Sequence, residues 1–311
     1  MRKILRYCIQ HARSTMQPSW LAGFFAITAV GFIINYTYDL EDGVIDQLPG
    51  SLRIAGMFLF HSIPFLLVAL LFSRHMPDKR WYRNRGFWLR FTAGFLILAL
   101  DRSFQLGSIL ADIDYADRAF LSSFLKRIIS LLTIVLPLYV ISLFFEREIP
   151  GRGYGLIVKR FDVKPYLVLL LIAGTGIAIG GLFQDIQDYY PRYLELQGPA
   201  FAQRHDIPSY LNLFGYEFAY GIDFISVEMF FRGFLIYSFS RYFGPYVVFP
   251  MILTYAFLHF GKPVTEAVSS LFGGYVLGVI SLNSKTIWGG VLIHVGIAWL
   301  MELIGYFYRL G

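Results

Sequence analysis

The sequence predicts an all-α fold, a polytopic transmembrane helix bundle with about nine spans. Hydrophobic residues make up 56% of the 311 residues and charged residues 15%, a composition outside the range of soluble globular proteins. Apolar runs close to the roughly 20 residues that a helix needs to cross a bilayer recur along the whole chain. The loops between these runs alternate between acidic and basic. No soluble domain is therefore expected.

The charge pattern predicts the surroundings and the orientation of the chain. The formal net charge is +6 at pH 7, and Lys and Arg gather in loops between the spans rather than along one exposed face. We therefore expect a lipid bilayer around the protein and no nucleic-acid partner. Basic loops favour the cytoplasm, so we expect a cytoplasmic N-terminus and an integral protein of the cell inner (plasma) membrane. The single cysteine, Cys8, rules out an internal disulfide.

The N-terminal half is expected to begin with a basic, amphipathic interfacial segment over residues 1–20. The expected spans of this half are 20–36, 52–72, 87–106 and 128–145. An outer amphipathic segment with Asp112, Asp114 and Asp117 precedes the last of them. The Pro150-Gly151 pair then marks a turn. We expect it to divide an N-terminal bundle, residues 1–150, from a second transmembrane domain, residues 151–311.

The second domain begins with a span over 165–183, started by a proline. A long outer loop, 185–208, follows, and its tyrosines Tyr189, Tyr190 and Tyr193 are expected to form an interfacial aromatic belt, with substrate recognition as the alternative. The remaining expected spans are 210–239, 246–260, one that begins near Val264, and 287–306. The Gly274-x-x-x-Gly278 pattern in the eighth span predicts close helix packing.

Several ionisable residues fall inside these spans, where they normally need a partner or a task. Glu228 and Arg232 are one helical turn apart, so a buried ion pair is expected. His259 and His294 follow on the seventh and ninth spans. Counted from the inner helix ends, Glu228 and His259 lie level at roughly 20 Å, and His294 at about 13 Å, near Arg232. This spacing predicts one buried polar cluster.

These residues resemble the motifs of the CAAX-protease and bacteriocin-processing (CPBP) family of intramembrane endopeptidases. The family motifs are Glu-Glu-x-x-x-Arg, Phe-x-x-x-His and His-x-x-x-Asn, and the likeness covers about residues 210–301. Glu228 and Arg232 match the first motif, His259 the second and His294 the third. Tyr255 takes the place of the Phe. The resemblance implies a helical membrane protease whose catalytic residues include these four.

Two positions depart from the motifs, Val227 at the first Glu and Ala298 at the Asn. The first Glu is the one to which the family's water activation is assigned, so another carboxylate has to serve here. Asp223, one turn from Val227, and Glu266, at the start of the eighth span, are the alternatives. We expect Glu266, because only a short turn separates it from His259. A Glu at a helix start is also what the helix dipole favours.

The predicted chemistry is hydrolysis of a peptide bond in a membrane-associated peptide or protein. His259 and a carboxylate would activate water, and His294 would donate to the oxyanion. His259, His294 and one carboxylate would also make three ligands for a divalent metal such as zinc, although a metal-free mechanism fits the resemblance equally well. The alternative function is a catalytically silent membrane scaffold. A transporter is disfavoured because the chain has no repeated half.

Overall fold

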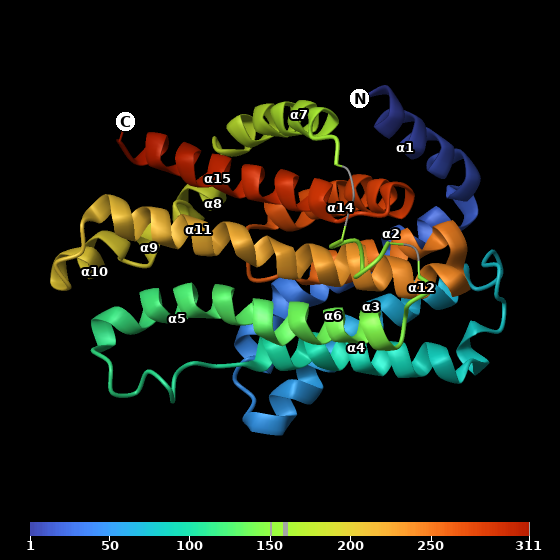
Figure 1. Cartoon of the computed structure of the whole chain (residues 1–311), viewed down its shortest axis with the longest axis horizontal. Coiled ribbons are helices and arrows are strands. Elements are labelled where there is room, and N and C mark those ends of the chain that lie inside the picture. Colours follow the sequence, from blue (N-terminus) through green and yellow to red (C-terminus); the bar gives the residue numbers. More distant parts are fainter. Residues whose placement is uncertain (150, 158–160, 311) are drawn as a thin grey trace.

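The computed structural model describes residues 1–149, 151–157 and 161–310. These residues form helices and turns without any strand. The helices lie side by side along the long axis of the molecule (Figure 1). The predicted all-α bundle is therefore confirmed.

The elements of the N-terminal half reproduce the expected order of spans. They are α1 (Arg2–Thr15), α2 (Pro18–Tyr38), η1 (Leu40–Ile45), α3 (Gly50–Phe72), η2 (Trp81–Arg83), α4 (Arg85–Ser103), α5 (Tyr115–Ser130), η3 (Leu131–Val135) and α6 (Leu136–Phe144). One start was predicted wrongly. The last three elements form a continuous helix of 30 residues from Tyr115. The Asp114 side chain caps it by accepting a hydrogen bond from the Ala116 amide at 2.9 Å, so the outer amphipathic segment is part of the helix from Tyr115 onward, Asp117 included.

The elements of the second half again follow the expected spans, with three short helices in the long loop. They are α7 (Lys164–Gly180), α8 (Gln184–Tyr189), α9 (Arg192–Glu195), α10 (Gly198–Arg204), α11 (Ser209–Glu228), η4 (Met229–Leu235), α12 (Ile236–Phe243), η5 (Gly244–Val247), α13 (Val248–Phe257), α14 (Val264–Ser284) and α15 (Trp288–Leu310). Helix α13 ends two residues before His259, which lies in the turn that follows. Gly261 in this turn has a φ of +80°, which favours glycine.

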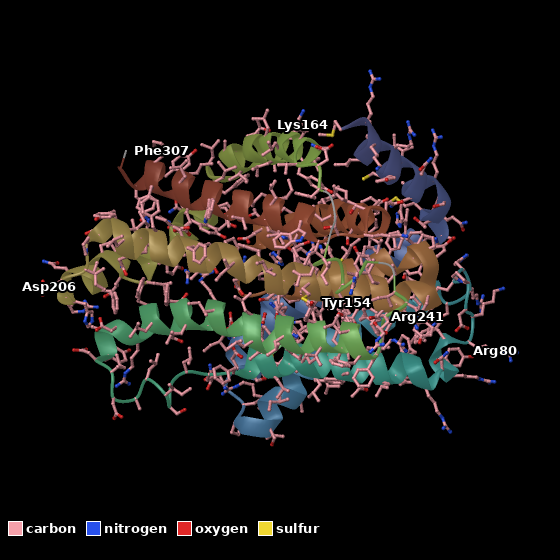
Figure 2. The ribbon with its side chains drawn as sticks, viewed as in Figure 1. Arg80, Tyr154, Lys164, Asp206, Arg241 and Phe307 are labelled. Atoms are coloured by element: carbon pink, nitrogen blue, oxygen red, sulfur yellow. The ribbon has the colours of Figure 1, made fainter. Side chains whose placement is uncertain are left out.

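The protein is an integral membrane protein of helical type. Five helices among the described residues are long and apolar enough to cross a bilayer, and α7 is a shorter apolar helix. Figure 2 shows Arg80 and Arg241 at one end of the bundle and Asp206 at the other. The count of nine spans, the inner membrane and the cytoplasmic N-terminus stay predictions.

The segments that carry the motifs lie at the centre of the bundle. All seven residues of η4 are buried, as are residues 248–256 of α13. A helix that is apolar on every side is expected in such a position. Helices α13 and α14 pack closely, because a Cβ at Gly278 would lie 2.5 Å from Met251 Cε and one at Gly274 would lie 3.1 Å from Tyr255 Cδ1. The predicted glycine packing is thus confirmed.

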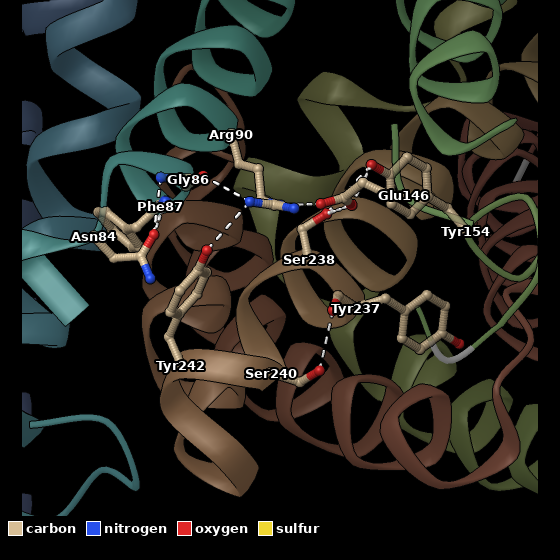
Figure 3. A network of polar contacts seen from close by, with 10 residues as sticks. All are labelled: Asn84, Gly86, Phe87, Arg90, Glu146, Tyr154, Tyr237, Ser238, Ser240 and Tyr242. Carbon is tan, nitrogen blue, oxygen red and sulfur yellow. Dashed lines mark hydrogen bonds and ion pairs between the residues drawn. The ribbon is translucent and has the colours of Figure 1, made fainter. Parts of the chain in front are cut away.

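A buried carboxylate connects the two halves of the chain (Figure 3). Glu146, just after α6, is 4% exposed. It accepts hydrogen bonds from Arg90 Nε of α4, Ser238 Oγ of α12 and, at 2.7 Å, the Tyr154 hydroxyl. The division into two domains at residue 150 stays a prediction, and Pro150 lies outside the described residues.

Candidate functional site

The predicted ion pair lies in the interior of the bundle. Glu228 ends α11, Arg232 lies in the π-helical segment η4, and both side chains are fully buried. Arg232 Nη1 is 3.1 Å from Glu228 Oε1. The guanidinium carbon of Arg232 also lies 3.9 Å from the centre of the Tyr255 ring, a cation–π contact. The charge of Arg232 is therefore held between a carboxylate and an aromatic face.

The carboxylate of Glu228 also contacts a histidine of α15. Its Oε1 atom is 2.7 Å from His294 Nδ1, and His294 Nε2 is 2.7 Å from the Tyr255 hydroxyl. The contact between carboxylate and imidazole has ion-pair distance without good hydrogen-bond alignment. A Cβ at Gly290 would lie 1.7 Å from Glu228 Oε2, so this close approach of α11 and α15 requires glycine. The result is a row of acid, imidazole and phenol.

His259 joins this cluster through Tyr255. Its Nδ1 is 3.0 Å from the Tyr255 carbonyl oxygen, and the two rings pack edge to face with centres 4.5 Å apart. The carbonyl accepts from Nδ1–H, which assigns the lone pair to Nε2. His259 is 9% exposed and lines a cavity. Its Nε2 is therefore the ring atom available to a bound molecule.

Glu266 lies in the first turn of α14 and is held on both oxygens. Lys262 Nζ is 2.6 Å from Oε1, and the Tyr190 hydroxyl donates to Oε2 at 3.0 Å. Burial, with nearby Tyr220 and Glu266, raises the pKa of Tyr190 well above its usual value, so the hydroxyl remains a donor. Burial alone would lower the pKa of Lys262, but the Glu266 carboxylate raises it overall, so the ammonium stays charged.

The expected aromatic belt is wrong for two of its three tyrosines. Tyr190 is 1% exposed and Tyr193 is 3% exposed, so both are buried in protein instead of lying at a lipid interface. The physical reason is that the loop folds back onto the bundle. Its backbone amide at Arg192 donates to the buried Glu302 carboxylate at 2.8 Å, and Tyr190 reaches Glu266.

A cavity of about 590 Å³ collects most of these groups. It lies among α7, α11, α13, α14 and α15, and its polar lining residues are Tyr190, Tyr220, Tyr255, His259, Lys262, Thr265, Glu266, Ser269, Ser270 and His294. Most of the remaining wall is apolar and comes largely from α7, α14 and α15. Glu228 and Arg232 are not among the lining residues and lie behind this wall. Such a volume and lining suit an extended apolar segment held by a few polar groups.

A second cavity has a volume of about 230 Å³. It contains Val227, which stands at the first Glu of the first motif, and Asp223, the alternative carboxylate. Asp223 and Val227 line it together with Lys126 and Arg127. Neither Asp223 nor Val227 lines the cavity that contains the histidines. The structure thus brings Glu266, rather than Asp223, into the cavity of His259 and His294.

The donors present do not fit a three-ligand metal site. Over residues 1–149, 151–157 and 161–310, no three His, Cys, Asp or Glu side chains come together as a metal-binding group. Nδ1 of His259 is engaged by a carbonyl, and both ring nitrogens of His294 have close neighbours. The zinc site of His259 and His294 therefore stays a prediction without geometric support.

Sequence reasoning did not identify three contributors to the site. Tyr255 was noted only as a replacement for Phe, although a hydroxyl in a membrane span is a signal for a polar partner. Lys262, four residues before Glu266, was detectable as a helical-spacing pair. Gly290 gave no signal, because its need for glycine comes from contact with a side chain of another helix.

Comparison with known proteins gives a family match over the segment that carries the motifs. No curated protein and no solved structure matches the chain. Residues 212–300 match a family model described as type II CAAX prenyl endopeptidase Rce1-like. Glu228, Arg232, Tyr255, His259, Glu266, His294 and Ala298 all lie within that segment. Over residues 212–300 the chain is thus similar to the Rce1-like type II CAAX prenyl endopeptidases, which confirms the resemblance predicted from its motifs.

Proposed function

We propose that the protein is an intramembrane endopeptidase that hydrolyses a peptide bond of a membrane-associated peptide or protein. The observation that carries the proposal is the cavity of about 590 Å³, in which His259, Glu266 and His294 meet an apolar wall. The Rce1-like match over the same segment supports a protease of CAAX type. The substrate and the mechanism rest on the geometry of the cavity.

In this mechanism His259 is the general base. Its Nε2 takes a proton from a water molecule while the water oxygen bonds to the substrate carbonyl carbon. Glu266 accepts a hydrogen bond from the same water, and its clamp of Lys262 and Tyr190 fixes its position. The proton on His259 then passes to the leaving nitrogen as the C–N bond breaks. The role of Glu228 and Arg232 is to hold His294 and Tyr255 in place from behind the wall.

The lining of the cavity favours a substrate that arrives from the lipid. Helix α7 is exposed on most of its surface, and only Tyr166 of it is buried. It packs beside α15 (Figure 1), and its residues Leu169, Ile172 and Ala173 line the cavity. An apolar wall at the surface of the bundle can receive the side chains of a peptide that is already in the bilayer.

The proposal is tested with purified protein in detergent and a library of membrane-spanning peptides, with cleavage read by mass spectrometry. We expect cleavage by the wild type and its loss in His259→Ala and in Glu266→Gln, each with an unchanged thermal unfolding midpoint. His75→Ala and Glu148→Gln are the matched controls, because both side chains are exposed and far along the chain from the cavity. Wild-type rates in both cavity variants would overturn the site assignment.

The second candidate function is a catalytically silent scaffold that binds membrane peptides in the same cavity. Two observations favour it: Val227 contributes no carboxylate, and Ala298 contributes no hydrogen-bond donor. A scaffold would bind the library peptides in the wild type and in Glu266→Gln alike. It would cleave none of them under any metal condition.

A further inference from the structure

We propose that Tyr255 is a further catalytic residue whose hydroxyl donates a hydrogen bond to the oxyanion formed during peptide hydrolysis. The inference rests on the proposed function, because it needs a reaction that forms an oxyanion in this cavity. His294 then acts as a positioning residue for Tyr255 rather than as the oxyanion donor itself.

The acid, the imidazole and the phenol lie in a row. Glu228 Oε1, which can only accept, lies 2.7 Å from His294 Nδ1, so the proton of the imidazole is favoured on Nδ1 even though the contact is not aligned as a hydrogen bond. The lone pair is then on Nε2, which accepts the Tyr255 hydroxyl at 2.7 Å. His294 consequently has no N–H left for the cavity. The donor at this point of the wall is the hydroxyl of Tyr255.

The Tyr255 ring is held rigidly by its neighbours. Its side chain is 3% exposed, and Arg232 covers one ring face at 3.9 Å from the centre. The rings of Phe231 and His259 pack edge to face against it, with centres 5.2 and 4.5 Å away. The hydroxyl can therefore move only by rotation about its C–O bond.

Tyr255 and the base His259 are also fixed relative to each other. Tyr255 lines the cavity together with His259, and Nδ1 of His259 is bonded to the carbonyl of Tyr255 itself. The base and the donor are thus fixed to the same turn of chain. When water attacks, the developing oxyanion is a stronger acceptor than neutral imidazole, so the hydroxyl hydrogen turns from His294 toward it. No covalent bond to Tyr255 is formed or broken.

Two departures from the family motifs lie in this one cavity. Ala298 lines the same cavity and has no polar side-chain atom, whereas the motif has Asn there. Tyr255 provides a hydroxyl where the motif has Phe. One donor is lost on α15 and one is gained on α13, on two helices that face one cavity. The second departure compensates for the first.

The test is Tyr255→Phe in the peptide-cleavage assay with the full-length protein. The variant keeps the ring against Arg232, so we expect a folded protein. We expect kcat to fall by about 100-fold or more with KM within about threefold, because removing one preorganised oxyanion donor typically has this effect. Tyr255→Phe combined with Ala298→Asn is expected to regain at least about tenfold in kcat, since it restores a donor to the same cavity.

The matched control is Tyr275→Phe on α14. It also removes a hydrogen bond between a tyrosine and a histidine, Tyr275 to His11 at 3.0 Å, but Tyr275 does not line the cavity. We expect its kcat to equal that of the wild type. A wild-type kcat in Tyr255→Phe, with cleavage by the wild type established, would overturn this inference and leave the proposed function intact. A wild type that cleaves no peptide overturns both.

Discussion

Removal of Arg232 tests whether the central ion pair stabilises the fold. Arg232→Ala leaves the Glu228 carboxylate in a place with no solvent exposure. Loss of one partner of a buried pair costs about 3 to 5 kcal/mol, because the remaining charge is neither solvated nor paired. With a shift of roughly 2 to 4 °C per kcal/mol for a protein of this size class, the unfolding midpoint is expected to fall by roughly 6 to 20 °C.

The structure makes the size of this effect depend on His294. Its Nδ1 is 2.7 Å from the same Glu228 oxygen, so a protonated His294 can replace part of the lost charge. The loss in Arg232→Ala is therefore expected at the lower end of the range. The double variant Arg232→Ala/His294→Ala is expected to lose more than the sum of the two single variants, because no cation then remains beside Glu228.

The assay is thermal unfolding in detergent, followed by intrinsic fluorescence and by size-exclusion retention. Glu228→Gln/Arg232→Met is the control, since it removes both charges and keeps most of the volume. We expect it to be more stable than Arg232→Ala. An Arg232→Ala protein as stable as the wild type, with only its peptide cleavage lost, would refute the structural role of the pair.

Two further predictions follow from close contacts and from a buried acid. Gly290→Ala is expected to destabilise the protein by about 1 to 3 kcal/mol and to abolish cleavage, because the added Cβ would meet a Glu228 oxygen at 1.7 Å. Gly215→Ala is the control in the same unfolding assay, because a Cβ at Gly215 would meet no atom within 4 Å. Burial, opposed by Arg102, raises the pKa of Glu41 to about 7, so the folded state binds an extra proton between about pH 4.5 and 7. Wild-type stability should therefore fall relative to Glu41→Gln as pH rises through this window, and parallel midpoints from pH 5 to 8 would contradict it.

The architecture was predictable because the bilayer imposes it. A long apolar run in lipid has to form a helix to satisfy its backbone, so span positions follow from hydropathy. The predicted start at residue 128 was wrong because hydropathy does not show where an amphipathic helix begins; the helix begins at Tyr115. An amphipathic segment continues a span when its N-terminus is capped, and the Asp114 cap was not recognised as such.

The meeting of Glu228, Arg232 and His294 was predictable from depth, since rise per residue fixes how far each side chain lies along its helix. Rotation about the helix axis is a separate quantity. The sequence alone did not show that Glu228 turns toward α15 and Gly290, or that the Tyr255 hydroxyl contacts His294 Nε2. These contacts depend on how each helix packs against its neighbours.

The direction in which each side chain leaves the helix also explains why Val227 can replace the first Glu of the motif while Glu228 keeps its contacts with Arg232 and His294. Val227 and Glu228 are adjacent, so their side chains leave the helix in different directions. Val227 faces the second cavity, beside Asp223, Lys126 and Arg127, while Glu228 faces α15 and His294. The two acids of a Glu-Glu pair at these positions would thus serve different surroundings. In this chain the position that supports His294 is kept, and the carboxylate in the histidine cavity comes from the first turn of α14, through Glu266.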